Sequence, residues 1–571
     1  MNKKKVMALF LGLAMTFTSV PAVVQAEVQE TEAKIVNLKT EGMVEPLGLD
    51  EEKPSFSWQM QSDAIGAAQK SYQIVVTDET ETVVWDSGVV ESNISHDIPY
   101  EGEDLQPTTE YSWKVTVTDE QGNTLESEPA SFETAFMDTT RESWDGAQMI
   151  GATDLSLDAA SQCIFNISAW VQIPEGSSSA SFILGADDFR LENAVFNTES
   201  MAGENYVRIE LDISDVERSG ARINAYRMGY TADDSADTPV FTIEENESLN
   251  ELITPANKNE AHQIDINVSG SIFVISVDGE SVGDKFAINT LGDSSSYNSF
   301  PNLNSIGFAA KAGETASFTD YKITNTGRFA QGELFGENTG ATYAIFDGMD
   351  GVTMDGNVIT VDGGEAGVLN YADPTYSAAP MVRREFEAKT GIASARLYLT
   401  AEGIYNFYMN GQEVAPEEWF NPGCEEYDAY LAYNTYDVTD MLTEGTSAMG
   451  SVLGEGWWTG QMTFEASNYN YFGDQPAVMA KLVIEYEDGT SDTVVTDESW
   501  SYYNDGPVRL ASFFQGERYD ATKEAAVEGW TSAGFDASSW CPASIVETRK
   551  QFANAELVTR TDTPVCGGSE P

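Results

Sequence analysis

Hydrophobic and polar residues alternate with period two along most of the chain after about residue 33, and turn residues separate the alternating runs. Because successive side chains of a strand point to opposite faces, this pattern predicts half-buried β-strands. No stretch of this region sustains a helical period over several turns. We therefore expect an all-β fold, built as β-sandwiches that follow one another along the chain.

The first alternating region, residues 33–136, predicts about seven short strands in about 100 residues, the density of an immunoglobulin-like sandwich. Tyr111, Trp113, Val115 and Val117 occupy alternate positions, so we expect them on the inward face of one strand. The run from Leu105 to Trp113 resembles fibronectin type III modules. That resemblance implies a spacer role.

The second region, residues 152–327, has longer strands, such as His262–Val268 and Ile272–Val277. Asp278-Gly279 follows as a two-residue hairpin turn. The order of strands resembles laminin-G or concanavalin-like jelly rolls, which implies glycan binding, in some cases with calcium. Carboxylates in the loops could supply oxygen ligands for calcium, or they could simply be hydrated. They are Asp187, Asp188, Asp233, Asp234 and Asp237.

The third region, residues 328–560, continues the period-two pattern. Ala395–Thr400 and Tyr405–Met409 alternate cleanly, and Asn410-Gly411 after them predicts a type I′ turn. These features predict a third β-sandwich.

The N-terminus has the pattern of a secretory signal peptide, residues 1–26. Lys3, Lys4 and Lys5 precede an apolar run from Val6 to Val20, and small residues precede Glu27. A membrane anchor is the alternative, but the run is shorter than the roughly 20 residues that a span needs. We expect a secreted protein with no membrane span after cleavage.

Composition narrows the partners, catalytic mechanisms and metal sites to be expected of this chain. The formal net charge of −63 disfavours nucleic acid and anionic lipid as partners. Only His96 and His262 are present, so serine–histidine catalysis and histidine metal sites are not expected. The four cysteines form no zinc-ribbon spacing, although Cys541 and Cys566 could pair after export. No cofactor is expected, and calcium alone remains open.

Several motifs of the third region resemble the N-terminal region of bacterial α-L-rhamnosidases. In order, they are Arg396–Ala401, Tyr405, Asn410-Gly411, Tyr433–Thr439, Leu453–Gly460 and Gly516–Ala521. The resemblance implies a secreted glycoside hydrolase acting on terminal L-rhamnose, with rhamnose-containing glycans as partners. It also implies a galactose-binding-like sandwich at residues 328–560, with residues 145–151 as its first strand. The jelly roll is then inserted between that strand and the remainder.

The resemblance further implies a catalytic (α/α)6 barrel as a partner domain after this region. The sequence to Pro571 contains neither the acidic motif of that barrel nor its helical repeats. We therefore expect a carbohydrate-recognising portion with no catalytic residue of its own. Two alternatives stay open: a free-standing secreted glycan-binding protein, and an active rhamnosidase that uses another pair of carboxylates about 5 to 10 Å apart.

Sugar sites combine flat aromatic rings with planar hydrogen-bonding groups. Glycines flank Trp457 and Trp458, which predicts exposed rings, with packing in the core as the alternative. Some members of the family bind rhamnose through this sandwich with the help of calcium, which implies oxygen ligands. Asn410, Asn421, Glu425 and Glu426 are the candidates for them.

The family's usual tryptophan is replaced here by Cys424, which makes nearby tyrosines the alternative platforms. They are Tyr427, Tyr430, Tyr469 and Tyr471, for which packing is the other interpretation. The Gly516–Asp520 motif implies a network at the interface with the barrel. Our predicted sugar-binding set is Trp457, Trp458, Glu455, Asn410 and Tyr427.

Overall fold

The computed structural model describes residues 33–566 apart from several internal gaps. These gaps are residues 153–156, 158, 161, 193–199, 202, 289–299, 328–331, 337–342, 376–377, 461, 463–469, 514–515, 549 and 561–564. The predicted signal peptide and Tyr469 therefore lie outside the described residues. The chain forms two compact units. The first contains the chain before residue 45 with residues 53–103 and 111–131, and the second contains residues 45–52, 104–110 and 132–571.

The first unit is a small sandwich. Its sheets have the orders β1-β2-β5 and β4-β3-β6-β7. As the alternation predicted, Tyr111, Trp113, Val115 and Val117 of β6 are all buried. The Trp113 ring lies 4.6 Å from the Phe56 ring, which fills the space between the sheets. The strands are β1 (Lys34–Thr40), β2 (Ser55–Gln61), β3 (Gln69–Asp78), β4 (Val83–Asp86), β5 (Ile98–Pro99), β6 (Glu110–Asp119), β7 (Thr124–Glu126) and β8 (Ala130–Glu133).

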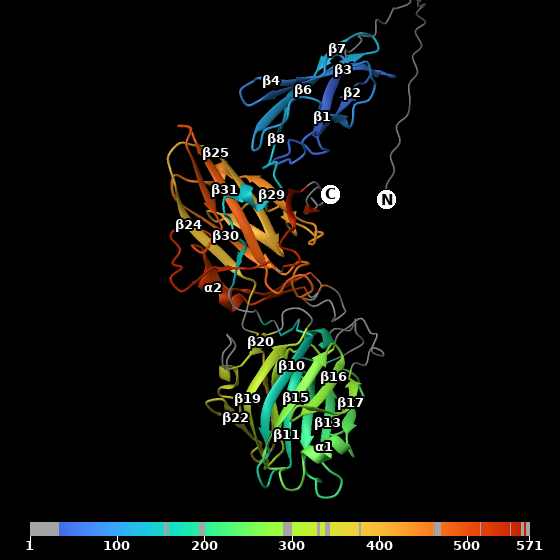
Figure 1. The fold of residues 1–571 in the computed structure, drawn as a ribbon, viewed down its shortest axis with the longest axis vertical. Helices are drawn as coiled ribbons and strands as arrows, with labels where there is room; N and C mark the ends of the chain where they lie inside the picture. The colour runs from blue at the N-terminus through green and yellow to red at the C-terminus, as the bar shows by residue number, and fades with distance from the viewer. Residues whose placement is uncertain are drawn as a thin grey trace, which may run out of the picture. The chain divides into compact units, whose positions relative to one another are not determined.

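The second unit contains a jelly roll of two large sheets around one core. One sheet has the order β17-β16-β15-β10-β19-β22-β21, much of which can be followed in Figure 1, and β20 also pairs with β19. The other has the order β14-β13-β12-β11-β18-β23. Asp278 and Gly279 form the predicted turn between β16 and β17, both with positive φ.

The strands of the first jelly-roll sheet are β10 (Ile164–Gln172), β15 (Ala261–Ser269), β16 (Ile272–Val277), β17 (Glu280–Ala287), β19 (Thr315–Asn325), β20 (Gly332–Phe335), β21 (Val352–Asp355) and β22 (Val358–Asp362). Those of the second are β11 (Ser179–Ala186), β12 (Tyr206–Asp212), β13 (Arg222–Met228), β14 (Phe241–Ile243), β18 (Ser305–Ala310) and β23 (Val368–Ala372).

The jelly roll extends further along the chain than we predicted. We placed its end at residue 327, but β20 to β23 pair into its two sheets, so the third module cannot begin at residue 328. The hairpin of β21 and β22 has the alternation and turn residues of any sandwich. Local pattern does not tell which sheet a strand joins, because that depends on pairing between distant segments.

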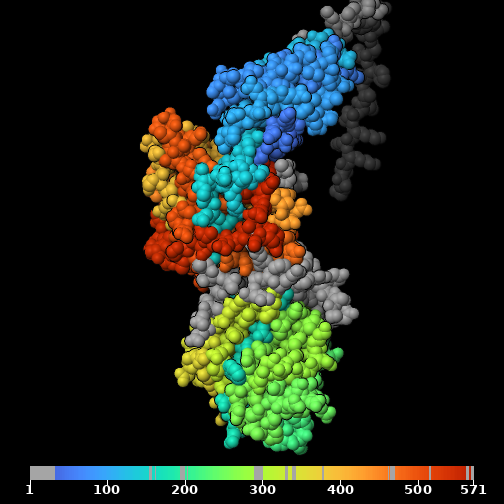
Figure 2. All heavy atoms as spheres, viewed as in Figure 1, coloured from blue at the N-terminus to red at the C-terminus, as the bar shows by residue number. Residues whose placement is uncertain are grey.

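The third module is a sandwich of two sheets. Their orders are β27-β26-β30-β24-β33-β36 and β37-β9-β31-β25-β29-β38, and β32 also pairs with β31. Asn410 and Gly411 form the predicted turn between β26 and β27. The short strand β9 pairs with β31 and β37, although the whole jelly roll separates β9 from the rest of its sheet in sequence. Figure 2 shows the cyan atoms of the chain before the jelly roll among the orange and red atoms of the sandwich.

The strands of the two sandwich sheets are β9 (Ile150–Gly151), β24 (Met381–Ala388), β25 (Ile392–Glu402), β26 (Ile404–Met409), β27 (Gln412–Glu413), β29 (Tyr430–Asp437), β30 (Gly445–Gly454), β31 (Ala477–Tyr486), β32 (Ser491–Val495), β33 (Ser501–Tyr503), β36 (Cys541–Pro542), β37 (Ser544–Ile545) and β38 (Glu556–Thr559). Two further strand pairs of this module form small sheets of their own: β28 (Glu418–Trp419) with β39 (Val565–Cys566), and β34 (Val508–Ser512) with β35 (Gly516–Tyr519).

Helices are few. The described α-helices are α1 (Glu247–Leu252) and α2 (Glu524–Val527), and neither is long enough to cross a bilayer. The described 3-10 turns are η1 (Arg141–Trp144), η2 (Phe189–Glu192), η4 (Tyr343–Phe346), η5 (Thr439–Met441) and η7 (Ala521–Lys523). The predicted all-β fold class is thus confirmed.

A buried ion pair ties the chain before β9 to the centre of the sandwich. Arg396 of β25 donates from Nε to both carboxylate oxygens of Glu133, at 3.0 and 2.8 Å. The side chains are only 19% and 7% exposed. Burial raises the pKa of Glu133, although the Arg396 charge acts in the opposite direction. The carboxylate therefore depends on its partner to stay charged in this position.

Removing the arginine alone should be costly. We expect Arg396→Met to destabilise the sandwich by about 3 to 5 kcal/mol, because Glu133 would remain buried without a counter-charge. Hydrogen exchange of the β25 amides measures this free energy. Adding Glu133→Gln should recover much of the loss, and Lys389→Met, which breaks an exposed pair, should have a smaller effect. Equal destabilisation by the single and double variants would contradict this account.

Candidate functional site

The two adjacent tryptophans of the predicted sugar site have different surroundings. Trp457 is half-buried, whereas Trp458 is 2% exposed and belongs to a core cluster. The Trp458 ring lies 4.9 Å from the Tyr427 ring, which is itself 1% exposed. The flanking glycines thus expose part of one ring only. Trp458 and Tyr427 have the packing role that was the alternative interpretation of both.

Asn410 lies far from these rings. Its Nδ2 donates to the Met441 carbonyl at 2.9 Å and to Ser447 Oγ at 3.1 Å, and its Oδ1 accepts from the Ala448 amide. These bonds close the turn after β26. The antiparallel register of β26 and β30 puts Asn410 at the opposite end of the strand pair from Glu455, roughly 24 Å away at 3.4 Å per residue.

Glu455 directly follows β30 and is half-buried. Its backbone amide donates to the Ala511 carbonyl at 3.0 Å. Its carboxylate lies against Gly460, where an added Cβ would be 2.2 Å from Oε2. Because Gly460 lacks a side chain, it leaves room for the Glu455 carboxylate. The structure brings Glu455 and Trp457 together and leaves Asn410 apart.

Three aromatic residues that sequence reasoning missed lie near Trp457, and two of them, Phe420 and Phe513, are in ring contact with it. A parallel bridge between Gly456 and Ser512 joins the ends of β30 and β34. It brings Trp457 beside Phe513, with ring centroids 4.6 Å apart. Phe420 lies 5.2 Å from Phe513 and 6.4 Å from Trp419. We call these four residues, Trp419, Phe420, Trp457 and Phe513, the aromatic shelf.

The shelf is open to solvent. Trp419, Phe420 and Phe513 are 54%, 38% and 45% exposed. Contiguous exposed apolar surface of this kind usually marks a binding site. The sequence did contain Trp419-Phe420 as adjacent aromatics, but Phe513 lies far along the chain and only the Gly456–Ser512 bridge makes it a neighbour.

A hydrogen-bond network continues from the shelf segment into the sandwich. Glu418 Oε2 accepts from Tyr436 Oη and from Asn421 Nδ2, both at 3.0 Å. Arg560 donates to Asn421 Oδ1 at 2.7 Å. Burial raises the pKa of Tyr436, so its hydroxyl stays a donor at neutral pH. The network holds residues 418–421 in place at the base of the shelf.

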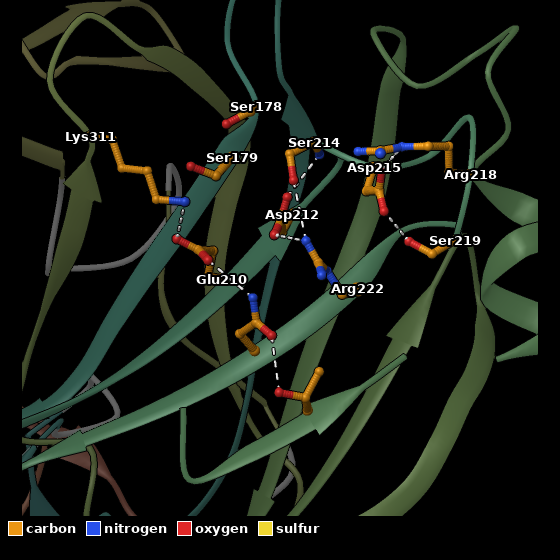
Figure 3. A network of polar contacts seen from close by, with 12 residues as sticks. Ser178, Ser179, Glu210, Asp212, Ser214, Asp215, Arg218, Ser219, Arg222 and Lys311 are labelled. Atoms are coloured by element: carbon orange, nitrogen blue, oxygen red, sulfur yellow. Dashed lines mark hydrogen bonds and ion pairs between the residues drawn. The ribbon is translucent and has the colours of Figure 1, made fainter. Parts of the chain in front are cut away.

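A second polar network lies on the jelly roll (Figure 3). Glu210 is 1% exposed and is bonded to Lys311 at 3.0 Å, to Asn224 at 3.1 Å and to Tyr226. Arg222 bonds Asp212 at 2.9 Å. The buried carboxylates of this network face cations and donors of the protein itself. Their arrangement is that of structural ion pairs.

The loop carboxylates that we considered for calcium also have protein partners in part. Asp188 is fully buried and paired with Arg190 at 2.6 Å. Asp234 is paired with Arg227 at 2.7 Å. Asp187 accepts from the Gly203 amide, while Asp233 and Asp237 are exposed. Within the described ranges, no three acidic, histidine or cysteine residues are arranged to hold a metal ion.

Comparisons with known proteins agree with the family resemblance that the sequence motifs indicated. Residues 390–566 match the family described as alpha-L-rhamnosidase N-terminal domain, and residues 35–138 match the family described as Rha78A-like, N-terminal immunoglobulin domain. The α-L-rhamnosidase of Streptomyces avermitilis is 28% identical over 540 residues, which are 93% of this chain and 46% of that enzyme. An α-L-rhamnosidase of an Alteromonas species is 32% identical over 173 residues, covering 30% of this chain and 18% of its own.

The fold has a counterpart among solved structures. The crystal structure of the Streptomyces avermitilis α-L-rhamnosidase complexed with L-rhamnose aligns with a TM-score of 0.53 and 24% identity, over 93% of this chain and 46% of that one. This chain thus spans about half the length of that relative. The predicted resemblance is confirmed: the chain carries the immunoglobulin-like and rhamnosidase N-terminal domains of the α-L-rhamnosidases, and corresponds to the N-terminal part of these enzymes.

Proposed function

We propose that this chain is the carbohydrate-recognising N-terminal portion of a secreted α-L-rhamnosidase-like glycoside hydrolase that acts on terminal L-rhamnose. Cleavage would belong to a helical barrel domain outside the described residues. One observation carries the proposal: similarity to the Streptomyces avermitilis enzyme runs over 93% of this chain, so it includes the jelly roll as well as both domains matched by family. The solved structure of that enzyme contains L-rhamnose.

The environment of the buried carboxyl group of Glu402 supports a non-catalytic role for this residue. A glycosidase needs a proton-bearing acid that reaches the glycosidic oxygen and a second carboxylate across from it. Burial raises the pKa of Glu402 to about 7, so this carboxyl is about half protonated at neutral pH. However, Glu402 is only 1% exposed, and its Oε1 accepts from Thr548 Oγ1 at 2.5 Å. A sugar in solvent has no access to it.

Binding and turnover can be tested separately. We expect the purified chain to bind methyl α-L-rhamnoside in isothermal titration, to bind methyl α-D-glucoside much more weakly, and to release no aryl group from an aryl α-L-rhamnoside. Absence of rhamnoside binding would contradict the recognition role. Turnover that a single carboxylate substitution abolishes would establish the alternative of an active site within this chain. Binding with no barrel encoded downstream would favour a free-standing glycan-binding protein.

The raised pKa of Glu402 also leads to a prediction about how the stability of the fold depends on pH. Its native pKa is raised from 4.5 to about 7, so the folded chain holds a proton that the unfolded chain releases in this range. Stability should therefore fall as pH rises from about 4.5 to about 7, by up to about 3 kcal/mol at 1.36 kcal/mol per pKa unit. Glu402→Gln keeps an acceptor for Thr548 without a charge, and should be more stable than the parent at pH 8.

Calorimetric melting of both proteins between about pH 5 and pH 8 measures this difference. Glu487→Gln, at an exposed position of the same sandwich, is the control and should leave the pH dependence unchanged. If Glu402→Gln and the parent lose melting temperature in parallel over this range, Glu402 is not the group responsible.

A further inference from the structure

The aromatic shelf contains a strained backbone conformation. Phe420 has φ of +62°, in the left-handed region that bulky side chains rarely adopt. Such strain persists where the surrounding structure imposes it, and it gathers at binding sites. The ring of Phe420 remains 38% exposed, so the strained residue is not held there to fill a core.

Most of the large apolar residues that the sandwich exposes are aromatic. The sandwich exposes six large apolar side chains among its described residues, and five of them are aromatic. Trp419, Phe420 and Phe513 are gathered in the shelf, and the sixth residue, Val565, is the strand partner of Trp419. Sugar rings present C–H faces that stack on aromatic rings.

One hydrogen-bonding side chain belongs to the same short strand as Trp419, β28. Glu418 directly precedes Trp419, and both of its described side-chain hydrogen bonds use Oε2. Glu418 as a whole is half-exposed, and its Oε1 makes no hydrogen bond to any described residue, so this oxygen remains able to accept from a hydroxyl group. The chain's formal charge of −63 disfavours an anionic ligand. A neutral polyol with an apolar face fits this combination.

We infer that the aromatic shelf binds a neutral pyranose, with ring C–H groups stacked on Trp419 and Phe513 and a hydroxyl group donating to Glu418 Oε1. This inference rests on the proposed function, because it names the surface through which recognition occurs. Within the sugar class, a 6-deoxy sugar adds a methyl group to the apolar face, which increases the area that the rings cover.

Substitutions in the shelf test the inference with methyl α-L-rhamnoside as the probe. Trp419→Ala and Phe513→Ala should each weaken binding by about tenfold in isothermal titration, because each removes a stacking face. Glu418→Gln should weaken binding less, since an amide oxygen still accepts a hydrogen bond. Tyr519→Ala is the matched control: this aromatic residue is 51% exposed in the same sandwich but lies outside the shelf, and its loss should leave affinity unchanged.

Two further variants separate binding from folding. Phe420→Asn places a residue that tolerates positive φ at this position, so its melting temperature should stay close to that of the parent while affinity falls. Trp419→Phe keeps an aromatic face and should bind within about threefold of the parent. The rhamnoside-induced change in tryptophan fluorescence should, however, be reduced in this variant.

The outcomes distinguish the inference from the proposed function. If the parent chain binds the rhamnoside and the shelf variants bind it equally well, recognition stands and the shelf is excluded as its site. If the parent chain binds no rhamnoside, both proposals fail. Loss of binding in Trp419→Ala and Phe513→Ala, with unchanged melting temperatures and an unaffected Tyr519→Ala, would support the shelf.

Discussion

The sandwich depends on the central position of β25 between β31 and β29. Both backbone edges of β25 are paired, ten residues with β31 and four with β29. Because every other side chain of a paired strand is fixed to one face, β25 directs Leu397 and Leu399 into the core between the sheets. On its other face Tyr398 packs against Phe136, and Arg396 meets Glu133. One strand thus organises both faces of its sheet.

The same strand also brings the candidate site together. After Glu402, Gly403 turns the chain out of one sheet, and β26 joins the other through β30. Gly403 has φ of +114°, and an added Cβ would be 2.5 Å from the Gly454 carbonyl oxygen. This close approach places the start of β26 beside the end of β30, where Glu455 and Trp457 follow. The shelf is therefore built on loops anchored at the ends of paired strands, an arrangement typical of binding sites.

Burial separates the aromatic residues of this region into two groups. Trp458 and Tyr427 contact each other inside the sandwich, whereas Trp419, Phe420 and Phe513 keep large exposed fractions. Trp457 lies between the groups, half-buried against the core cluster and in contact with Phe513. The carboxylates separate in the same way. Glu402 is buried and its pKa is raised, whereas Glu418 is half-exposed and only one of its oxygens accepts hydrogen bonds from described residues. Of these aromatic and carboxylate side chains, only the exposed ones can be reached by a ligand from solvent.

Local sequence patterns were enough to predict many of this protein's strands and turns. Alternation predicted the strands, and Asn410-Gly411 and Asp278-Gly279 predicted two turns, because these features depend on neighbouring residues alone. The ordered motifs from Arg396 to Ala521 indicated the family. Tertiary structure alone decided that β20 to β23 belong to the jelly roll, that Trp458 is buried beside Tyr427, and that Phe513 joins Trp457. Each of these outcomes rests on pairing or packing between residues distant in sequence, for which no local pattern carries a signal.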